Sequence, residues 1–423
     1  MHIERAALDE LFDTATRSRV CVVIAAAGWG KSTAVVSWAR SRRVAWLRSD
    51  HETDGARWLR RLYEVLLPHI SIESPVPLES PIPLESPELE LSGEKRVGMS
   101  VAAMCNWLRS SLREELVVVV EDLQELPPAS DAVRLLEDLC RQAPGLLHIV
   151  LISRRELSFP LERMRGQGLI TEINAADLAF EVAEVAALLR ATVSEDPPGL
   201  AGLVGERTGG WPAALHCAVG ILRGVPPDQR YGVVEHLTAP GERFHGYLAA
   251  EVLGSEPKRV RQVLRRLAVL GEVRSTTEVA SRNDLAADVL ADLIRRGLVR
   301  RRAGDPAHWL LVQPVADFFE HKAVLSVGER MRLHAATAQG CLRRGAHAEA
   351  LRHLVAAGDH RSCAALLIEH GAALMDSGQA AAVVAAAELP PEYLEDPRIQ
   401  RVLGQARHMR GQWAAAKECY QRA

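Results

Sequence analysis

An apolar run that ends in a glycine-rich turn constrains this chain more than any other segment. Residues 20–33 read VCVVIAAAGWGKST, a strand-like stretch that leads through two glycines, a lysine and two hydroxyl residues into a helical pattern. Small residues in such a turn let consecutive backbone N–H groups surround phosphate oxygens, while the lysine reaches the β- and γ-phosphates and the hydroxyl binds Mg²⁺. This is the Walker A pattern, with Ala25 where its first glycine usually stands; the alternative is a chance glycine turn. The predicted nucleotide-binding residues are Ala27, Gly28, Trp29, Gly30, Lys31, Ser32 and Thr33.

The first 175 residues alternate short apolar runs with amphipathic stretches. Runs such as Val20–Ala25, Leu116–Val120 and Leu146–Ile152 are separated by helical patterns such as Lys31–Ala39. Parallel strands need crossover connections, so this alternation predicts an α/β domain with a parallel sheet and helices on both faces. The length of 423 residues leaves room for two to four domains at about 100–200 residues each.

Two acids follow a second apolar strand. The segment LVVVVEDLQEL places Glu121 and Asp122 at the strand end, where a Walker A loop needs a carboxylate to hold or orient Mg²⁺. Either acid is a candidate metal partner together with Ser32, and both are candidate catalytic residues. The alternative is a strand end with two solvated acids. Glu121 lies 90 residues after Lys31 (121 minus 31), with Val44–Leu47 as an intervening strand. This predicts an acidic strand set apart from the first strand, as in ATPases that add a strand between them.

A third strand-like run, LLHIVLISR, brings Arg154 to the same carboxyl edge of the sheet, where ligands bind in open α/β folds. Arg154 is the candidate sensor of the γ-phosphate, and its neighbour Arg155 is the alternative. A structural ion pair is an equally good explanation for either arginine.

Glu73–Glu90 reads ESPVPLESPIPLESPELE, a six-residue repeat whose prolines remove backbone donors. We predict a proline-rich mobile insertion over residues 68–98, with a docking peptide as the functional alternative. After Ala179 the pattern becomes helical. Leu285–Ile294, Leu298–Arg302 and Trp309–Val312 then predict the helix, strand, strand order of a winged helix.

The chain is helical again after about Val327. Near its end, the spacing of Leu403–Gly404, Gly411, Ala416 and Tyr420 fits a tetratricopeptide-like helix pair. Because one such unit cannot bury its own face, we expect the natural protein to continue beyond residue 423.

Together, AAAGWGKST, VVVVEDLQEL, HIVLISRREL, RMRGQGLITEINAADLAFEVAEVAALL and TGGWPAAL resemble one family over the whole chain. The chain is similar to the signal-transduction ATPases with numerous domains, and among them to the large ATP-binding LuxR-type regulators related to the maltose-regulon activator. The resemblance implies four domains: a nucleotide-binding domain (1–175), a helical lid (176–238), a winged helix (239–325) and a helical arm with the start of tetratricopeptide-like repeats (326–423).

The resemblance also implies ligands and roles. Pro212, in Gly210–Trp211–Pro212, matches the proline that contacts the nucleotide base, and Gln313 stands where the family often has a nucleotide-contacting histidine. The implied ligands are ATP or ADP with Mg²⁺. The implied function is a switch that ADP keeps closed, that ATP and an inducer open for self-association, and that slow hydrolysis resets. DNA binding would require the family's helix-turn-helix, which lies outside these residues.

Two other functions remain open: a constitutive ATPase, and a DNA binder acting through the basic winged helix, Arg259, Arg261, Arg265, Arg266 and Arg295–Arg302. With 51 Lys and Arg against 54 Asp and Glu, the chain shows no global nucleic-acid footprint. Its N-terminus, MHIERAALDELF, is charged where a signal peptide needs an apolar run, and its seven scattered cysteines fit a reducing compartment. We therefore expect a cytoplasmic protein without a membrane span.

Overall fold

The computed structural model describes residues 3, 5–51, 53–70, 94–193, 197–235, 246–254, 256–273, 286–302, 305–322, 325–386 and 389–423. The chain divides into two compact units. The first comprises Met1–Ser255, Leu290–Arg300 and Val312–Asp317, and the second comprises Glu256–Val289, Arg301–Leu311 and Phe318–Ala423. The finer division at residues 175, 238 and 325 stays a prediction.

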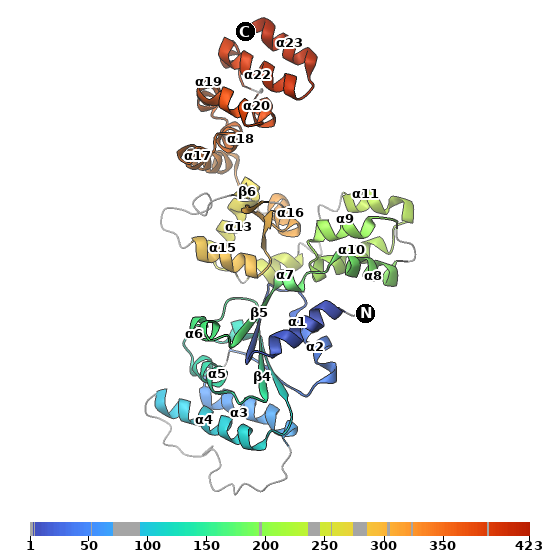
Figure 1. The fold of residues 1–423 in the computed structure, drawn as a ribbon, viewed down its shortest axis with the longest axis vertical. Helices are drawn as coiled ribbons and strands as arrows, with labels where there is room; N and C mark the ends of the chain where they lie inside the picture. The colour runs from blue at the N-terminus through green and yellow to red at the C-terminus, as the bar shows by residue number, and fades with distance from the viewer. Residues whose placement is uncertain are drawn as a thin grey trace. The chain divides into compact units, whose positions relative to one another are not determined.

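A five-stranded parallel sheet forms the centre of the first unit (Figure 1). Its strands are β1 (Val20–Ile24), β2 (Val44–Arg48), β3 (Leu116–Glu121), β4 (Leu147–Ser153) and β5 (Ile170–Asn174). They lie in the order β2-β3-β4-β1-β5, and every neighbouring pair is parallel. The predicted α/β fold class is confirmed.

Helices cover both faces of this sheet. They are α1 (Ala6–Thr16), α2 (Lys31–Trp38), α3 (Gly55–Leu66), α4 (Glu94–Ser111), α5 (Asp131–Gln142) and α6 (Glu162–Gly166). On one face, Val118 and Val120 of β3 share an apolar cluster with Trp58 of α3, Leu108 of α4 and Leu136 of α5. On the other face, α1 packs against β1, β4 and β5. Burial on both faces explains why the strands are continuous apolar runs.

The sheet order separates the first strand from the acidic strand, as predicted. The strand that lies between β1 and β3 is β4, whereas β2, which contains Val44–Leu47, forms the edge of the sheet beyond β3. The expectation that Val44–Leu47 intervenes therefore holds along the chain but not in space. Because strands β1, β3 and β4 are parallel and adjacent, their carboxyl ends all meet at one edge.

A bundle of short helices follows the sheet: α7 (Ala175–Leu178), α8 (Val182–Thr192), α9 (Leu200–Thr208), α10 (Pro212–Leu222) and α11 (Arg230–Glu235). Val185, Leu189, Val204, Leu215 and Val234 form its own apolar cluster. The π-helical segment η5 (Leu248–Leu253) also belongs to the first unit.

The second unit contains most of the remaining helices and strands. They are α13 (Lys258–Leu270), β6 (Glu272–Val273), α15 (Ala286–Arg295), β7 (Val299–Arg302), β8 (Asp305–Leu311) and α16 (Gln313–Lys322), of which α15, β7 and α16 also contribute residues to the first unit. The three strands form a sheet in the order β6-β8-β7. The predicted helix, strand, strand order is confirmed by α15, β7 and β8. Along α13 the apolar residues Val263, Leu264 and Leu267 are buried while Arg259 and Arg261 are exposed, as a solvated basic face requires.

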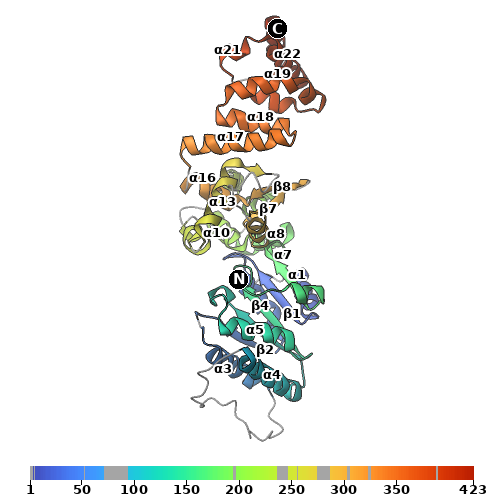
Figure 2. The same cartoon turned by 90° about the vertical axis from the view of Figure 1, so that its left-hand side faces the viewer.

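The rest of the second unit is an all-helical arm, in which α17, α18 and α19 succeed one another as layers (Figure 2). Its helices are α17 (Val327–Arg343), α18 (His347–Ala357), α19 (His360–Asp376), α20 (Ala380–Ala385), α21 (Pro391–Leu394), α22 (Pro397–Met409) and α23 (Trp413–Arg422). A Cβ on Gly404 would lie 2.7 Å from the Tyr420 ring, so α22 and α23 approach through a small residue beneath an aromatic one, as predicted.

The predicted proline-rich insertion lies mostly outside the described residues, which resume at Glu94 with α4. All seven cysteines are free thiols. Across the described ranges, no helix is both long and apolar enough to cross a bilayer.

Candidate functional site

The turn after β1 presents a row of unused backbone donors. Gly28 and Gly30 adopt φ angles of +79° and +72°, a left-handed conformation that favours glycine. Helix α2 begins directly after Gly30, and no side chain caps its N-terminus. Within the described part of the chain, the N–H groups of residues 27–30 donate to no protein acceptor. Free donors at an uncapped helix N-terminus are the arrangement that binds phosphate.

Lys31 lies inside this turn and is only 8% exposed. Its Nζ donates to the carbonyl oxygens of Ala25, at 2.7 Å, and Ala26, at 3.0 Å. Ser32 is half-buried beside it, while Thr33 is exposed on the same helix.

The surroundings of Lys31 disfavour its charge. Burial, and after it the positive charge of Arg154, lower the pKa of Lys31 to about 7, and Arg296 acts in the same direction. Asp122 and Glu121 oppose this shift without cancelling it. A bound polyanion would supply the missing negative charge, so the electrostatics of the loop favour binding of an anion.

Glu121 faces the phosphate loop. Its carboxylate accepts a hydrogen bond from Ser32 Oγ and another, at 2.9 Å, from Trp46 Nε1. A hydroxyl and a carboxylate in contact at this edge are the two protein groups that usually hold Mg²⁺ beside nucleotide phosphates. Of the two candidate acids, Glu121 is therefore the one brought to Ser32.

Asp122 has other hydrogen-bond partners. It adopts φ +58° and accepts hydrogen bonds from Arg48 Nε at 2.8 Å and from Gln124 Nε2 at 2.9 Å. Burial alone would raise the pKa of Asp122, but the hydrogen bonds from Gln124 and Arg48 outweigh it, so the pKa is lowered. The carboxylate thus stays ionised close to the loop.

Gln124 connects the two strand ends that carry the candidate groups. While its amide nitrogen donates to Asp122, its amide oxygen accepts from the backbone N–H of Arg154 at 2.9 Å. The guanidinium of Arg154 lies 3.4 Å from Glu251 of η5. Arg154 therefore lies at the predicted carboxyl edge of the sheet. It is close enough to Lys31 to lower its pKa, and it also forms an ion pair with Glu251.

The loop is covered by residues from elsewhere in the first unit. Trp29 is 3% exposed, and its ring stacks on that of Trp211 with centroids 5.4 Å apart and planes 7° from parallel. On the other side, a Cβ on Gly297 would lie 2.6 Å from Trp29 Cζ2. The Trp29 side chain therefore packs these segments together, and the role of this residue in nucleotide binding stays a prediction.

Residues beside Trp211 extend this cover. Pro212 begins α10, and its Cγ lies 3.5 Å from where a Cβ on Gly30 would stand. The N–H of Ala213 donates to the carbonyl of Gly28 at 3.1 Å, and Tyr247 Oη would lie 2.6 Å from a Cβ on Gly28. Only glycine fits at position 28.

The segment after α15 touches the loop as well. The carbonyl of Arg296 accepts from the N–H of Ala26 at 3.0 Å, and the Arg296 side chain pairs with Asp292 at 2.9 Å. Gln313, predicted to contact nucleotide, donates to Asp317 of its own helix at 2.7 Å. We call Trp211, Pro212, Ala213, Tyr247, Arg296 and Gly297 the clamp residues.

These residues fit a nucleotide with Mg²⁺. The turn at Gly28 and Gly30, the free N–H groups and Lys31 would bind phosphate. Ser32 and Glu121 would offer Mg²⁺ a hydroxyl and a carboxylate. The described residues contain no group of three or more His, Cys, Asp and Glu side chains that could hold a metal by themselves. Mg²⁺ at phosphate sites needs no such group, because phosphate oxygens and water complete its shell.

Sequence reasoning missed several participants: Trp46, Arg48, Gln124, Ala213, Tyr247, Glu251 and Arg296. Arg296 was visible only as one of many arginines in a basic stretch, and its burial of 97% distinguishes it, since arginines are rarely fully buried without a partner. Trp211 was part of a quoted motif, but nothing in the sequence pairs it with Trp29.

Sheet and loop together define a P-loop nucleotide-binding fold. The chain is 23% identical to the HTH-type transcriptional regulator MalT of Yersinia pestis and Yersinia pseudotuberculosis over 378 residues. The aligned region covers 87% of this chain. The chain is thus a distant homologue of MalT, and the resemblance is confirmed. The chain spans 40% of the length of these curated relatives.

Other comparisons add less. No family model matches the chain. A signal transduction ATPase with numerous domains and a tetratricopeptide repeat sensor, from Pyrococcus horikoshii, aligns over 99% of this chain and 57% of its own, with a TM-score of 0.38 and 12% identity. A Walker-type ATPase of Pyrococcus abyssi aligns over 75% and 95%, with a TM-score of 0.45 and 13% identity. Because both scores lie below 0.5, the fold assignment rests on the sheet order and loop of this chain.

Gly297→Ala should loosen the clamp. Its Cβ would overlap Trp29 and Ala175, and relieving such an overlap typically costs about 1–3 kcal/mol. We expect hydrogen exchange of the amides of residues 25–30 to speed up by roughly tenfold. Gly271→Ala is the matched control, since Gly271 has nearly the same φ, +73° against +74°, but open space around it. Equal exchange at the loop in both variants would contradict the contact.

Proposed function

We propose that this chain is the nucleotide-binding and regulatory part of a transcriptional regulator, in which ATP or ADP controls a closed and an open state. The observation that carries the proposal is that one loop serves two purposes. Its backbone and Lys31 are arranged for phosphate, while its tryptophan is held by segments far away in the sequence. The homology to MalT supports the regulatory setting.

In this proposal the chain's own residues divide the work. The N–H groups of residues 27–30 and Lys31 bind the phosphates, and Ser32 with Glu121 holds Mg²⁺, which neutralises phosphate charge when bound. Asp122, fixed by Arg48 and Gln124, orients a water for slow hydrolysis. Arg154 senses the γ-phosphate and is in contact with Glu251 beyond the sheet, so phosphate occupancy competes with this ion pair.

Opening requires more than one contact to change. Moving a two-state equilibrium from 1:99 to 99:1 takes about 5.5 kcal/mol, more than one hydrogen bond supplies. The clamp residues supply several contacts that break together. We therefore propose that ATP needs an inducer as a second signal, and that the open form self-associates.

The remaining parts of the proposal concern partners and place. DNA binding would belong to a helix-turn-helix outside these residues; the MalT relatives are named HTH-type transcriptional regulators. The buried free thiols, such as Cys21 and Cys140, fit the reducing cytoplasm.

The two acids should behave differently. Glu121→Gln removes the charge beside Ser32, so we expect the Mg²⁺-dependent gain in ATP affinity to fall by roughly tenfold, the loss typical of one charge-assisted contact. Asp122→Asn keeps a residue that tolerates the left-handed backbone, so affinity should change little while single-turnover cleavage slows. Calorimetry with and without Mg²⁺, alongside single-turnover assays, measures both. A larger loss of Mg²⁺-dependent affinity in Asp122→Asn would reverse the assignment.

Lys31 should couple nucleotide binding to protons. With a pKa of about 7 in the free chain, it is mostly neutral near pH 8, and phosphate contact favours its charged form. The bound state then holds more protons above pH 7, so binding should take up as much as about one proton and weaken as pH rises. Titration calorimetry in buffers of different ionisation enthalpy measures the uptake, which should be larger near pH 8 than near pH 6, where Lys31 is already charged in the free chain. Proton release by the wild-type chain would contradict this coupling.

A further inference from the structure

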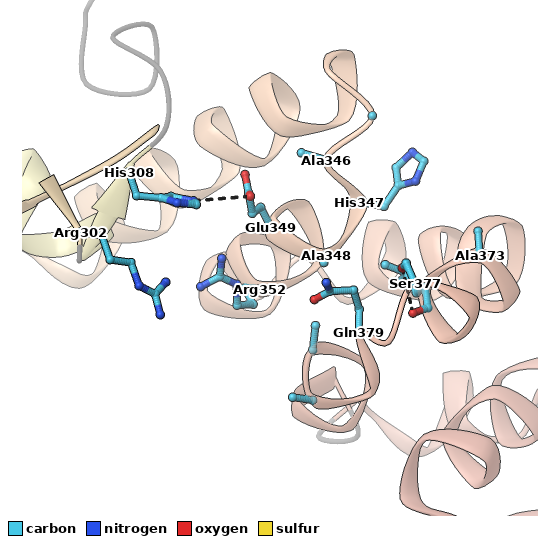
Figure 3. A pocket seen from close by; sticks show the side chains of 14 residues that line it. Arg302, His308, Ala346, His347, Ala348, Glu349, Arg352, Ala373, Ser377 and Gln379 are labelled. Atoms are coloured by element: carbon cyan, nitrogen blue, oxygen red, sulfur yellow. Dashed lines mark hydrogen bonds and ion pairs between the residues drawn. The ribbon is translucent and has the colours of Figure 1, made fainter. Parts of the chain in front are cut away.

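Two cavities in the described part of the second unit are large enough to hold a small molecule. The larger, of about 580 Å³, has polar side chains in much of its wall, among them Glu349, which lies 3.8 Å from Nε2 of His308 (Figure 3). The smaller, of about 500 Å³, is bordered by α13, α16, α17 and α18. Both volumes are in the usual range for small-molecule sites, about 300–1,000 Å³. The smaller cavity differs in its lining, where large apolar side chains stand beside two arginines.

Apolar side chains form most of the wall of the smaller cavity. Val327 and Met331, one helical turn apart on α17, are 65% and 41% exposed. An apolar ligand in the cavity would remove part of this area from water, which is favourable. The wall therefore favours a hydrocarbon body over a polar one. The apolar lining residues are Ala268, Val269, Phe319, Leu325, Val327, Met331 and Ala356.

Two arginines add positive charge to the same space. Arg265 belongs to α13, and Arg330 belongs to α17, three residues after Val327. The Nε–H group of Arg265 is buried, and no hydrogen-bond partner for it lies among the described residues. A buried donor without a partner lowers stability, so an acceptor oxygen of a ligand would be favoured at this position.

The histidine in the wall is neutral and already has a partner. Burial and, after it, the positive charge of Arg330 lower the pKa of His334. Its Nδ1 lies 3.0 Å from Nδ1 of His353 on α18. His334 therefore adds no charge to the cavity at pH 7, and the charge that a ligand meets there comes from the arginines and from nearby carboxylates.

Two carboxylates lie near Arg265 and leave its Nε–H unpaired. Glu329 accepts hydrogen bonds from Ser326 Oγ at 2.6 Å and from the Ser326 N–H at 3.0 Å. These hydrogen bonds lower the pKa of Glu329, and Arg332 and Arg265 act in the same direction. Glu320 lines the cavity and is exposed. Glu329 thus caps its own helix, and neither carboxylate is the acceptor that the buried Nε–H lacks.

These features together select a class of ligand. A carboxylate has two oxygens in one plane, which match the planar donors of a guanidinium group. A single negative charge suits this cavity better than a double one, because Glu320 in the wall would repel a dianion more strongly. The apolar wall requires the rest of the ligand to be hydrocarbon.

We propose that this cavity binds a medium-chain aliphatic monocarboxylate, with the carboxylate on Arg265 and the alkyl chain against Phe319 and Met331. Arg330 adds a second positive charge near the carboxylate. The site lies on other elements than the phosphate loop and does not depend on the nucleotide function proposed above.

Calorimetric titration of the full chain with octanoate, hexanoate and 1-octanol, each below the concentration at which it aggregates, tests the ligand class. We expect octanoate to bind at one site per chain. Hexanoate should bind roughly fifteenfold more weakly, because each buried CH₂ group contributes about fourfold in affinity. 1-Octanol should bind about tenfold or more weakly than octanoate, since it lacks the charge that pairs with Arg265.

Variants of the wall test the position of the ligand. Arg265→Gln should weaken octanoate binding by about tenfold, because the charge-assisted contact is lost. Arg261→Gln is the matched control, since it changes an exposed arginine on the same helix that does not line the cavity, and it should bind like the parent. Met331→Gln keeps a good helix former at an exposed position, so the chain should fold normally and bind octanoate several-fold more weakly.

Three results would overturn the proposal: no binding of octanoate, equal binding of octanoate and 1-octanol, or unchanged octanoate binding in Arg265→Gln. If Arg265→Gln does not fold, Met331→Gln decides in its place, and unchanged binding there would overturn the site. Tighter binding of octyl phosphate than of octanoate would overturn the choice of a carboxylate.

Discussion

The stacking of Trp29 on Trp211 is the contact on which the first unit depends. A tryptophan in the middle of a phosphate loop cannot stand in water without cost, because burying a large aromatic side chain is worth several kcal/mol. Here it is buried between Trp211 and the backbone at Gly297, which come from the helical bundle and from the segment after α15. The same few residues that form a phosphate cradle thereby hold together three parts of the chain. Anything that moves the loop must also move its cover.

The charges around Lys31 act on the same phosphate loop. The ammonium of Lys31 is surrounded by carbonyl oxygens, with Arg154 and Arg296 close enough to disfavour its charge. The negative charges opposite are already engaged, Glu121 with Ser32 and Trp46, and Asp122 with Arg48 and Gln124. A polyanion at the loop relieves this imbalance. Because Arg154 is also paired with Glu251, and the Arg296 carbonyl holds Ala26, that relief is coupled to the cover.

Much of the fold could be predicted from sequence because its signals are local. A short run rich in β-branched residues, such as LVVVVE, is typical of a buried strand, and Gly28 and Gly30 mark a turn at a helix start. The position of the separating strand could not be predicted in the same way, since strand order in space does not follow order in the chain, and β4 rather than β2 fills the gap.

The candidate site also contains residues that could be predicted from the sequence and residues that could not. Lys31, Ser32 and Glu121 were predictable from spacing, and Ser32 and Glu121 do meet. The choice between Glu121 and Asp122 was not, because the partners that hold the two carboxylates, Trp46 and Arg48, lie 75 and 74 residues away in the sequence. Arg296, Tyr247 and the Trp211 stack depend on contacts between residues 182 (211 minus 29) to 270 (296 minus 26) positions apart, which a single chain's pattern does not encode.

The release rate of a fluorescent ADP analogue from the full chain, compared with Trp211→Ala, tests most directly whether the cover controls the nucleotide. Loss of the stacking contact should lower the stability of the closed state relative to the open state by about 1–2 kcal/mol or more. Release of the analogue should therefore accelerate by roughly tenfold. Trp107→Ala, which removes a half-buried tryptophan packed on Tyr63 instead, should release the analogue at close to the wild-type rate. Equal release from wild type and Trp211→Ala would contradict the account, since the loop would then bind nucleotide without regard to what covers it.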